Sequence, residues 1–170
     1  MRRSIVSVVL GIAVFTLVCA SGAQAQPSPE QKKLEFFVGR WKIDTDVKAS
    51  DDGPANKTSG IEECEWFANL HVVCKADSTT AAGNYRTMRI ISWVPALKLY
   101  SQYAVDSYGY ALLSTGQLSG NTWTFTTDLP GGKMRSTIKT AGDGYTVTSG
   151  LVGAGGKFTQ TGTGKGTRTK

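Results

Sequence analysis

From about residue 40 to the C-terminus, apolar and polar side chains alternate with a period of two, the pattern of β-strands that bury one face. Short clusters of Gly, Pro, Asn, Asp and Ser interrupt this pattern and predict tight turns. Strands are expected at residues 40–48, 58–67, 70–77, 85–94, 98–106, 109–118, 121–128, 133–140, 144–151 and 157–168. Because no helical segment separates them, they predict an all-β, antiparallel up-and-down meander. A meander of this length normally closes into a barrel, which removes its edges.

A short helix is predicted immediately before the first strand. Ser28 fits the N-cap position, Pro29 the first helical position, and Gln31 can complete a capping box. Leu34 and Phe37 lie on one apolar face of this segment. A helix of two to three turns is marginal by itself. We therefore expect it to dock on one end of the barrel and cap it.

The helix is followed by Gly39-Arg40-Trp41, and a G-x-W at the start of the first strand resembles the lipocalin-like barrels. In that arrangement the tryptophan plugs the closed end of the barrel. The glycine lets the chain turn from helix into strand without a Cβ clash. By analogy with lipocalins, Arg168 on the last strand is expected to stack over Trp41, so that Gly39, Trp41 and Arg168 together close the barrel floor.

Four segments of the chain resemble the domain-of-unknown-function family 1579, which groups uncharacterised lipocalin-like proteins. They are residues 34–41, Ile90-Ile91-Ser92-Trp93, Leu99-Tyr100-Ser101-Gln102-Tyr103 and the closing Gly166-Thr167-Arg168-Thr169-Lys170. The resemblance covers residues 30–170. It implies a barrel of about ten strands with an N-terminal helix across one end, and it attaches no activity or substrate.

The first 25 residues have the pattern of a secretory signal peptide. Arg2 and Arg3 precede an apolar run, and Ala23-Gln24-Ala25 is a small-x-small cleavage site. A lipoprotein acylated at Cys19 is disfavoured, because Val18 stands where a small residue is needed. We expect residues 26–170 to form one domain that is periplasmic or secreted, with no membrane insertion after the leader is removed.

Removal of the leader leaves two cysteines, Cys64 and Cys74. An even pair in an exported chain favours a disulfide. The residues between them read as strand, turn and strand, with Asn69 at the turn, so folding brings the two cysteines opposite each other. Two reduced, buried cysteines are the alternative. A metal site is not expected, because the pair has no obvious further ligands nearby.

The chain carries a formal net charge of +6, but its basic residues are spread over many strands. A nucleic-acid partner would require a concentrated basic stripe, so none is expected. The single histidine, His71, lies on the third predicted strand. Nitrobindin, a related ten-stranded haem barrel, has its histidine ligand late in its chain. A surface histidine is therefore favoured here, and no cofactor is expected.

Glu62, Glu63 and Glu65 form the densest acidic cluster. Alternation places Glu63 and Glu65 on one face of the strand and Glu62 on the other, with Cys64 and Trp66. Carboxylates that faced a cavity could do acid–base chemistry or bind a hard cation. An outward, solvated pair of Glu63 and Glu65 is favoured, because burying unpaired carboxylates costs several kcal/mol. A carboxylate-based enzyme therefore stays a minor alternative, and no catalytic residue is assigned.

The aromatic residues are spread over most strands, and some must line the interior. Trp66, Arg89, Trp93 and Tyr103 are predicted to line a cavity that suits a small, mostly apolar molecule, or an elongated amphiphile with an anionic head. The function expected is thus an exported, lipocalin-like binding protein without catalysis. The alternative is an envelope protein-interaction module with a filled barrel. A lumen above roughly 300 Å³ favours the binding protein, and a packed lumen favours the interaction module.

Overall fold

The computed structural model of this protein describes residues 26–49 and 54–170. The predicted signal peptide, its cleavage site and Cys19 lie outside the described residues, as does part of the first loop. Among the helices in the described part, none combines the length and the apolar character that crossing a membrane requires.

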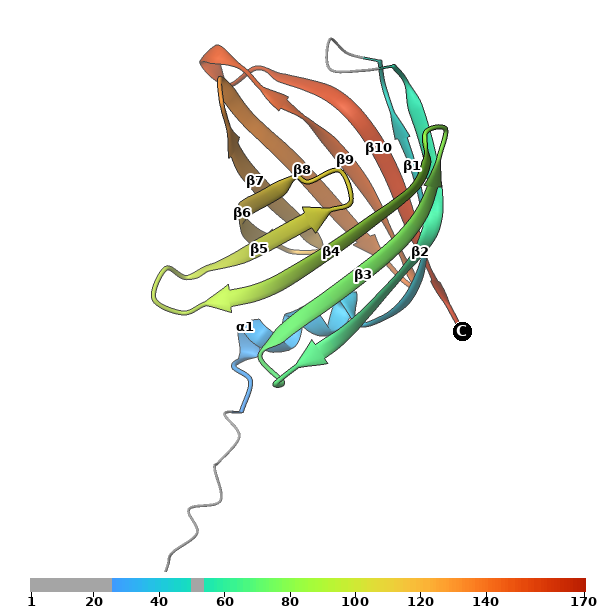
Figure 1. Cartoon of the computed structure of the whole chain (residues 1–170). Coiled ribbons are helices and arrows are strands. Elements are labelled where there is room, and N and C mark those ends of the chain that lie inside the picture. The colour runs from blue at the N-terminus through green and yellow to red at the C-terminus, as the bar shows by residue number, and fades with distance from the viewer. Residues whose placement is uncertain (1–25, 50–53) are drawn as a thin grey trace, which may run out of the picture.

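Ten antiparallel strands close into a single barrel (Figure 1). Each strand pairs with its neighbours in sequence, and β1 pairs with β10 to complete the circle. The strands are β1 (Gly39–Val47), β2 (Asn56–Phe67), β3 (His71–Thr80), β4 (Gly83–Val94), β5 (Leu99–Asp106), β6 (Ala111–Ser119), β7 (Thr122–Leu129), β8 (Gly132–Ala141), β9 (Gly144–Val152) and β10 (Phe158–Thr169). The predicted up-and-down barrel is confirmed, and its strand bounds lie within a few residues of those expected. A short 3₁₀ turn, η2 (Ala154–Gly156), joins β9 to β10.

The N-terminal segment consists of α1 (Pro29–Lys32) and a 3₁₀ helix, η1 (Lys33–Phe37). Ser28 and Gln31 form the predicted capping box, in which each side chain accepts the other's backbone N–H. The segment is tighter than the expected α-helix. A 3₁₀ helix brings positions three apart onto the same side, and here both Leu34 and Phe37 are fully buried against the barrel. The segment lies across one end of the barrel, as expected (Figure 1).

Aromatic side chains fill the half of the barrel nearest this segment. The ring of Phe37 lies 5.0 Å from that of Trp123, and Tyr100 lies 4.7 Å from Trp123 and 4.9 Å from Trp93. Ile91 is buried in the same cluster. These tilted and edge-on contacts are favourable aromatic geometries. The helix-side half of the barrel is therefore a packed core.

Trp41 and Arg168 are register partners on β1 and β10. The Arg168 guanidinium lies 4.3 Å from the centre of the buried Trp41 ring, at cation–π distance. It also donates to the backbone carbonyls of Phe36 and Val38. Gly39 begins β1 with a φ of +120°, a conformation that favours glycine. Arg168 thus links β10 to the residues that lead from η1 into β1.

Gly162, Gly164 and Gly166 alternate along β10 and follow a β-bulge between Gln160 and Gly162. An ideal Cβ at Gly166 would lie 2.2 Å from the ring of Tyr145 on the neighbouring strand. The missing side chain is what allows this ring to lie against the backbone of β10. The wall that β10 contributes to the lumen is therefore mostly backbone.

Candidate functional site

Cys64 on β2 and Cys74 on β3 are register partners and form a disulfide, as predicted. The turn between them contains Ala68 and Asn69, with φ values of +53° and +58°. Two successive positive φ angles are the mark of a type I′ hairpin turn. Both cysteines are buried, so the bridge lies on the lumen side of the wall.

Glu62 lies two residues before Cys64 and faces the same interior. Arg89 on β4 donates to both of its carboxylate oxygens, over 2.9 Å and 2.6 Å. The two side chains are only 7% and 16% exposed, in the order Glu62 and Arg89. The sequence placed Glu62 on the face of Cys64 and Trp66 but did not predict this pairing. The signal in the sequence was the alternation along this strand, which puts Glu62 on the same side as Cys64 and therefore inside the barrel if Cys64 is buried.

Arg89 keeps its charge in this environment. Burial alone would lower the pKa of Arg89, but the charge and the hydrogen bonds of Glu62 outweigh burial and raise it. Arg89 also donates to Oε1 of Gln102 at 3.3 Å and lies 5.4 Å from the Phe37 ring centre. The ion pair therefore lies directly against the aromatic core, where it marks the floor of the remaining lumen.

Glu63 and Glu65 face outward and are exposed, as expected. Glu63 pairs with Arg40 on β1 across 3.2 Å, and both side chains are largely solvated. Such surface pairs contribute little to stability. These two carboxylates do not reach the lumen.

A cavity of about 210 Å³ lies beyond the ion pair, in the half of the barrel away from α1. Ile43, Met134 and Ile138 are among its apolar lining residues. This volume lies below the roughly 300–1,000 Å³ of ordinary ligand sites. The lumen is thus not fully packed, but it is smaller than the volume expected for a lipocalin-like binding protein.

Polar groups also line this cavity. Ser114 and Thr127 satisfy each other through a 2.7 Å hydrogen bond. Gln102 uses its carbonyl oxygen for Arg89, which leaves its amide nitrogen for another acceptor. Burial, and then the charge of Glu62, raise the pKa of Tyr145 to about 12, so its hydroxyl is protonated at neutral pH. The lining thus combines apolar walls with hydrogen-bond donors near the floor.

Of the four residues predicted to line the cavity, the structure places one in its lining and the other three elsewhere. Arg89 lines the cavity. Trp66 and Trp93 pack against the core at the filled, helix-side end, where Trp66 Nε1 donates to Glu35 at 2.6 Å. The prediction for Tyr103 is wrong, because its side chain is 45% exposed on the outer face. Its neighbour Gln102 is the residue of β5 that faces the lumen.

His71 lies on the outer face of β3, next to the buried, inward-facing Val72. Its Nδ1 lies 2.7 Å from the hydroxyl of Ser92. Its ring is 6.4 Å from that of Phe67, which is exposed. His71 therefore does not face the lumen.

Tyrosines gather at the rim of the barrel opposite α1. The Tyr85 hydroxyl donates to Asp106 at 3.0 Å, and the Tyr108 ring stacks on Tyr85 at 5.2 Å. The second oxygen of Asp106 accepts the backbone N–H groups of Tyr108 and Tyr110, which fixes the β5–β6 turn. Tyr108 and Tyr110 are 57% and 65% exposed. Tyr108 and Tyr110, called the rim tyrosines below, form an exposed aromatic edge at this end of the barrel.

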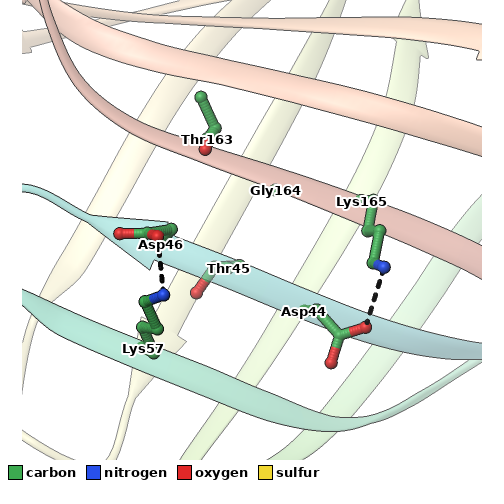
Figure 2. A pocket seen from close by; sticks show the side chains of 7 residues that line it. All are labelled: Asp44, Thr45, Asp46, Lys57, Thr163, Gly164 and Lys165. Atoms are coloured by element: carbon green, nitrogen blue, oxygen red, sulfur yellow. Dashed lines mark ion pairs between the residues drawn. The ribbon is translucent and has the colours of Figure 1, made fainter.

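A second hollow, of about 410 Å³, lies on β1, β2 and β10 (Figure 2). Its charged side chains already pair with one another: Lys57 with Asp46 at 3.4 Å, and Lys165 with Asp44 at 3.9 Å. These pairs are mostly solvated, so they hold no desolvated group for a ligand to satisfy. The lumen cavity is the stronger candidate site.

A family model described as "Protein of unknown function (DUF1579)" matches residues 26–168. The chain belongs to this family. The predicted relationship is therefore confirmed over nearly all of the DUF1579 barrel. No curated protein matches the chain.

Among solved structures, the DUF1579 barrel is similar to Rv2717c from M. tuberculosis, with a TM-score of 0.64 and 8% identity over 85% of this chain and 100% of that one. It is also similar to the S-type phycobiliprotein lyase CPES from Guillardia theta, with a TM-score of 0.57 and 11% identity over 83% of this chain and 93% of that one. At these identities the likeness shows the shared fold alone.

Proposed function

We propose that the DUF1579 barrel is an exported protein that binds a small ligand in the open half of its lumen. The observation that carries this proposal is the cavity of about 210 Å³ above the buried Glu62–Arg89 pair. Removing two charges from water is expensive, and a buried ion pair is weak evidence for a purely stabilising role. A polar floor beneath an unfilled space is instead what a ligand site requires.

The buried end of the ligand is uncharged in this proposal. Arg89 already has both carboxylate oxygens of Glu62 as partners. An anionic head would have to compete with Glu62 for Arg89 and would meet the repulsion of that carboxylate. A carbonyl, amide or hydroxyl group can instead pair with Gln102 and Tyr145. This replaces the anionic head that was expected in the case of an elongated amphiphile.

The ligand is either small or extends out of the barrel. About 210 Å³ holds only a small molecule or one end of a longer one. The rim tyrosines are exposed at the end of the barrel away from α1 and offer flat aromatic faces to the part that projects. An amphiphile with a neutral polar end and a planar or apolar remainder fits both regions.

Export is supported by the leader pattern in residues 1–25 and by the disulfide. The chain would then act in the periplasm or outside the cell. Catalysis by the carboxylates is disfavoured, because Glu62 is locked to Arg89 and the other two glutamates face solvent.

The test is native mass spectrometry of protein purified from its natural host without denaturant. Wild-type protein should carry a reproducible non-covalent adduct. Ser136→Trp should lose it, because Ser136 lines the cavity and an indole fills much of that space. The matched control is Thr137→Trp, one position further along β8 and on its outer face, which should retain the adduct. An adduct that survives in Ser136→Trp, or repeated clean apo masses of the wild type, would refute lumen binding.

A protein-interaction module remains a second candidate because of one observation on the outer wall. Tyr103 and Leu113 are register partners on β5 and β6, with 45% and 64% exposure. Exposed apolar side chains next to each other are a feature of protein contact sites. Tyr103→Ser with Leu113→Ser should leave the ligand adduct unchanged in the same mass spectra, but it should abolish any co-purifying protein partner.

A further inference from the structure

We propose that, when the disulfide is reduced, Cys64, Cys74 and Glu62 form a binding site for a divalent, thiol-preferring cation such as Zn²⁺. This proposal does not rest on the proposed ligand binding, although the cation site borders the same cavity through Glu62. No further ligand for the cysteine pair was expected from the sequence, and the structure supplies one in Glu62.

The three side chains converge on one point. One potential ligand atom from each lies within 4.8 Å of the other two, and all three residues are buried. Glu62 and Cys64 are two positions apart on β2, and Cys74 lies opposite Cys64 on β3. Zn²⁺ binds thiolate sulfur at about 2.3 Å and carboxylate oxygen at about 2.0–2.2 Å, so ligand atoms a few ångströms apart are what it needs. Rotation of the two cysteine side chains after reduction would provide this spacing.

The redox step needs an external dithiol as reductant. The dithiol donates two electrons, the Cys64–Cys74 bond breaks, and a disulfide forms within the reductant. The two protons of the dithiol pass to the cysteine sulfurs. Metal binding then displaces these protons into solvent as the two metal–sulfur bonds form.

The charges in the site balance when the cation is bound. Two thiolates and one carboxylate carry three negative charges, and a divalent cation together with the Arg89 guanidinium carries three positive ones. Arg89 is the register partner of Cys74 and already contacts Glu62. Neutrality matters here because an unbalanced charge in a buried site is costly.

A coordination position is left over on the cavity side. Glu62 lines the lumen cavity, so a cation held by its carboxylate borders that space. Three protein ligands with one open position are the arrangement in which zinc can bind water or an added ligand. The cation would thus occupy the floor of the lumen.

The experiment is an anaerobic Co²⁺ titration of the full-length mature protein after reduction with dithiothreitol and desalting. Reduced protein should bind one Co²⁺ per chain and show thiolate-to-cobalt charge-transfer absorption with tetrahedral d–d bands. Glu62→Gln should weaken binding by about 10-fold or more. The control Glu63→Gln, an exposed neighbour on the opposite face, should bind like the wild type. Oxidised protein and Cys64→Ala/Cys74→Ala should show no such absorption.

Near-ultraviolet circular dichroism establishes whether each sample keeps the packed aromatic core. If Glu62→Gln loses that signal, Glu62→Asp gives the same comparison, because its carboxylate is drawn back by one methylene. The proposal is overturned if reduced, folded protein shows no charge-transfer band, or if Glu62 and Glu63 variants bind equally. It is also overturned if reduction destroys the core signal and Co²⁺ does not restore it.

Discussion

Glu62 and Arg89 are both buried inside the barrel, and each is the other's oppositely charged partner. Both carboxylate oxygens accept from the guanidinium, which also reaches Gln102. This geometry is the strong, bidentate form of a charge-assisted hydrogen bond. Removing one partner of such a pair destabilises a protein mainly because the other charge is left buried and unpaired, more than because the energy of the pair is lost.

Glu62→Ala should therefore lower the free energy of unfolding by about 3–5 kcal/mol, because it leaves the Arg89 charge buried without a partner. Urea denaturation followed by tryptophan fluorescence measures this. Glu63→Ala, next along the strand but solvent-exposed, should change stability by about 0.5 kcal/mol or less. Equal effects of the two substitutions would contradict the burial of the pair.

Tyr145 gives the barrel a dependence on alkaline pH. Burial and the charge of Glu62 raise its pKa from 10.0 to about 12 in the folded protein. The unfolded chain therefore loses this proton first as the pH rises, which favours unfolding. The stabilising contribution is complete below about pH 10 and is lost progressively toward about pH 12.

Urea denaturation at about pH 9 and about pH 11 should thus show lower stability at the higher pH. Tyr145→Phe should reduce this loss without abolishing it, because the pKa values of Tyr85 and Tyr100 are also raised, first by burial. A loss of equal size in Tyr145→Phe would show that Tyr145 does not contribute.

At the scale of an element, the inward-facing glycines of β10 let neighbouring side chains lie against its backbone. Gly166 leaves room for the Tyr145 ring, whereas an ideal Cβ at Gly164 would meet its nearest atom, the Asp44 carbonyl oxygen, at 3.2 Å. The two positions face the same side of the same strand and differ in what they contact. They therefore form a matched pair for testing whether the strand is shaped to fit the ring.

Gly166→Ala should destabilise the protein by about 1–3 kcal/mol, because the new methyl group overlaps the Tyr145 ring. Gly164→Ala should cost clearly less, since a shift of a few tenths of an ångström relieves its contact. Thermal and urea denaturation of the two variants decide this. Equal costs would indicate that the ring does not lie on Gly166.

The strands themselves could be predicted because their signals are local. Turn residues such as Asn69 and the period-two alternation are properties of neighbouring residues, and they placed each strand within a few residues. The helical segment was predicted less well. Its capping box is local, but its 3₁₀ form depends on how Leu34 and Phe37 meet the barrel.

At the scale of the whole molecule, the barrel has two unlike halves. Aromatic side chains and η1 fill one half, and the other keeps a cavity above the ion pair. This division depends on contacts between residues far apart in sequence. Glu62 and Arg89, for example, come from strands that are separated by β3. The sequence could place both residues on an alternating face, but it could not show that they meet.

The same reason explains the error at Tyr103. An aromatic residue is equally suited to an inner or outer face of a strand, and alternation gives two faces without saying which is inside. Gln102, a polar residue, takes the inner position and supports Arg89. At these two positions of β5, the buried ion pair therefore favours a polar residue inside and leaves the aromatic one outside.

Methyl-labelled NMR of ligand-loaded and ligand-stripped protein tests the half-open lumen most directly. Removing the ligand should shift the methyl signals of Ile43, Met134 and Ile138, which line the cavity. The signals of Ile91, buried in the filled half, and Ile90, on the outer face, should stay in place. Shifts confined to Ile90 would instead put the ligand outside the barrel, and shifts centred on Ile91 would put it in the packed, helix-side half. Either result would contradict ligand binding in the open half of the lumen.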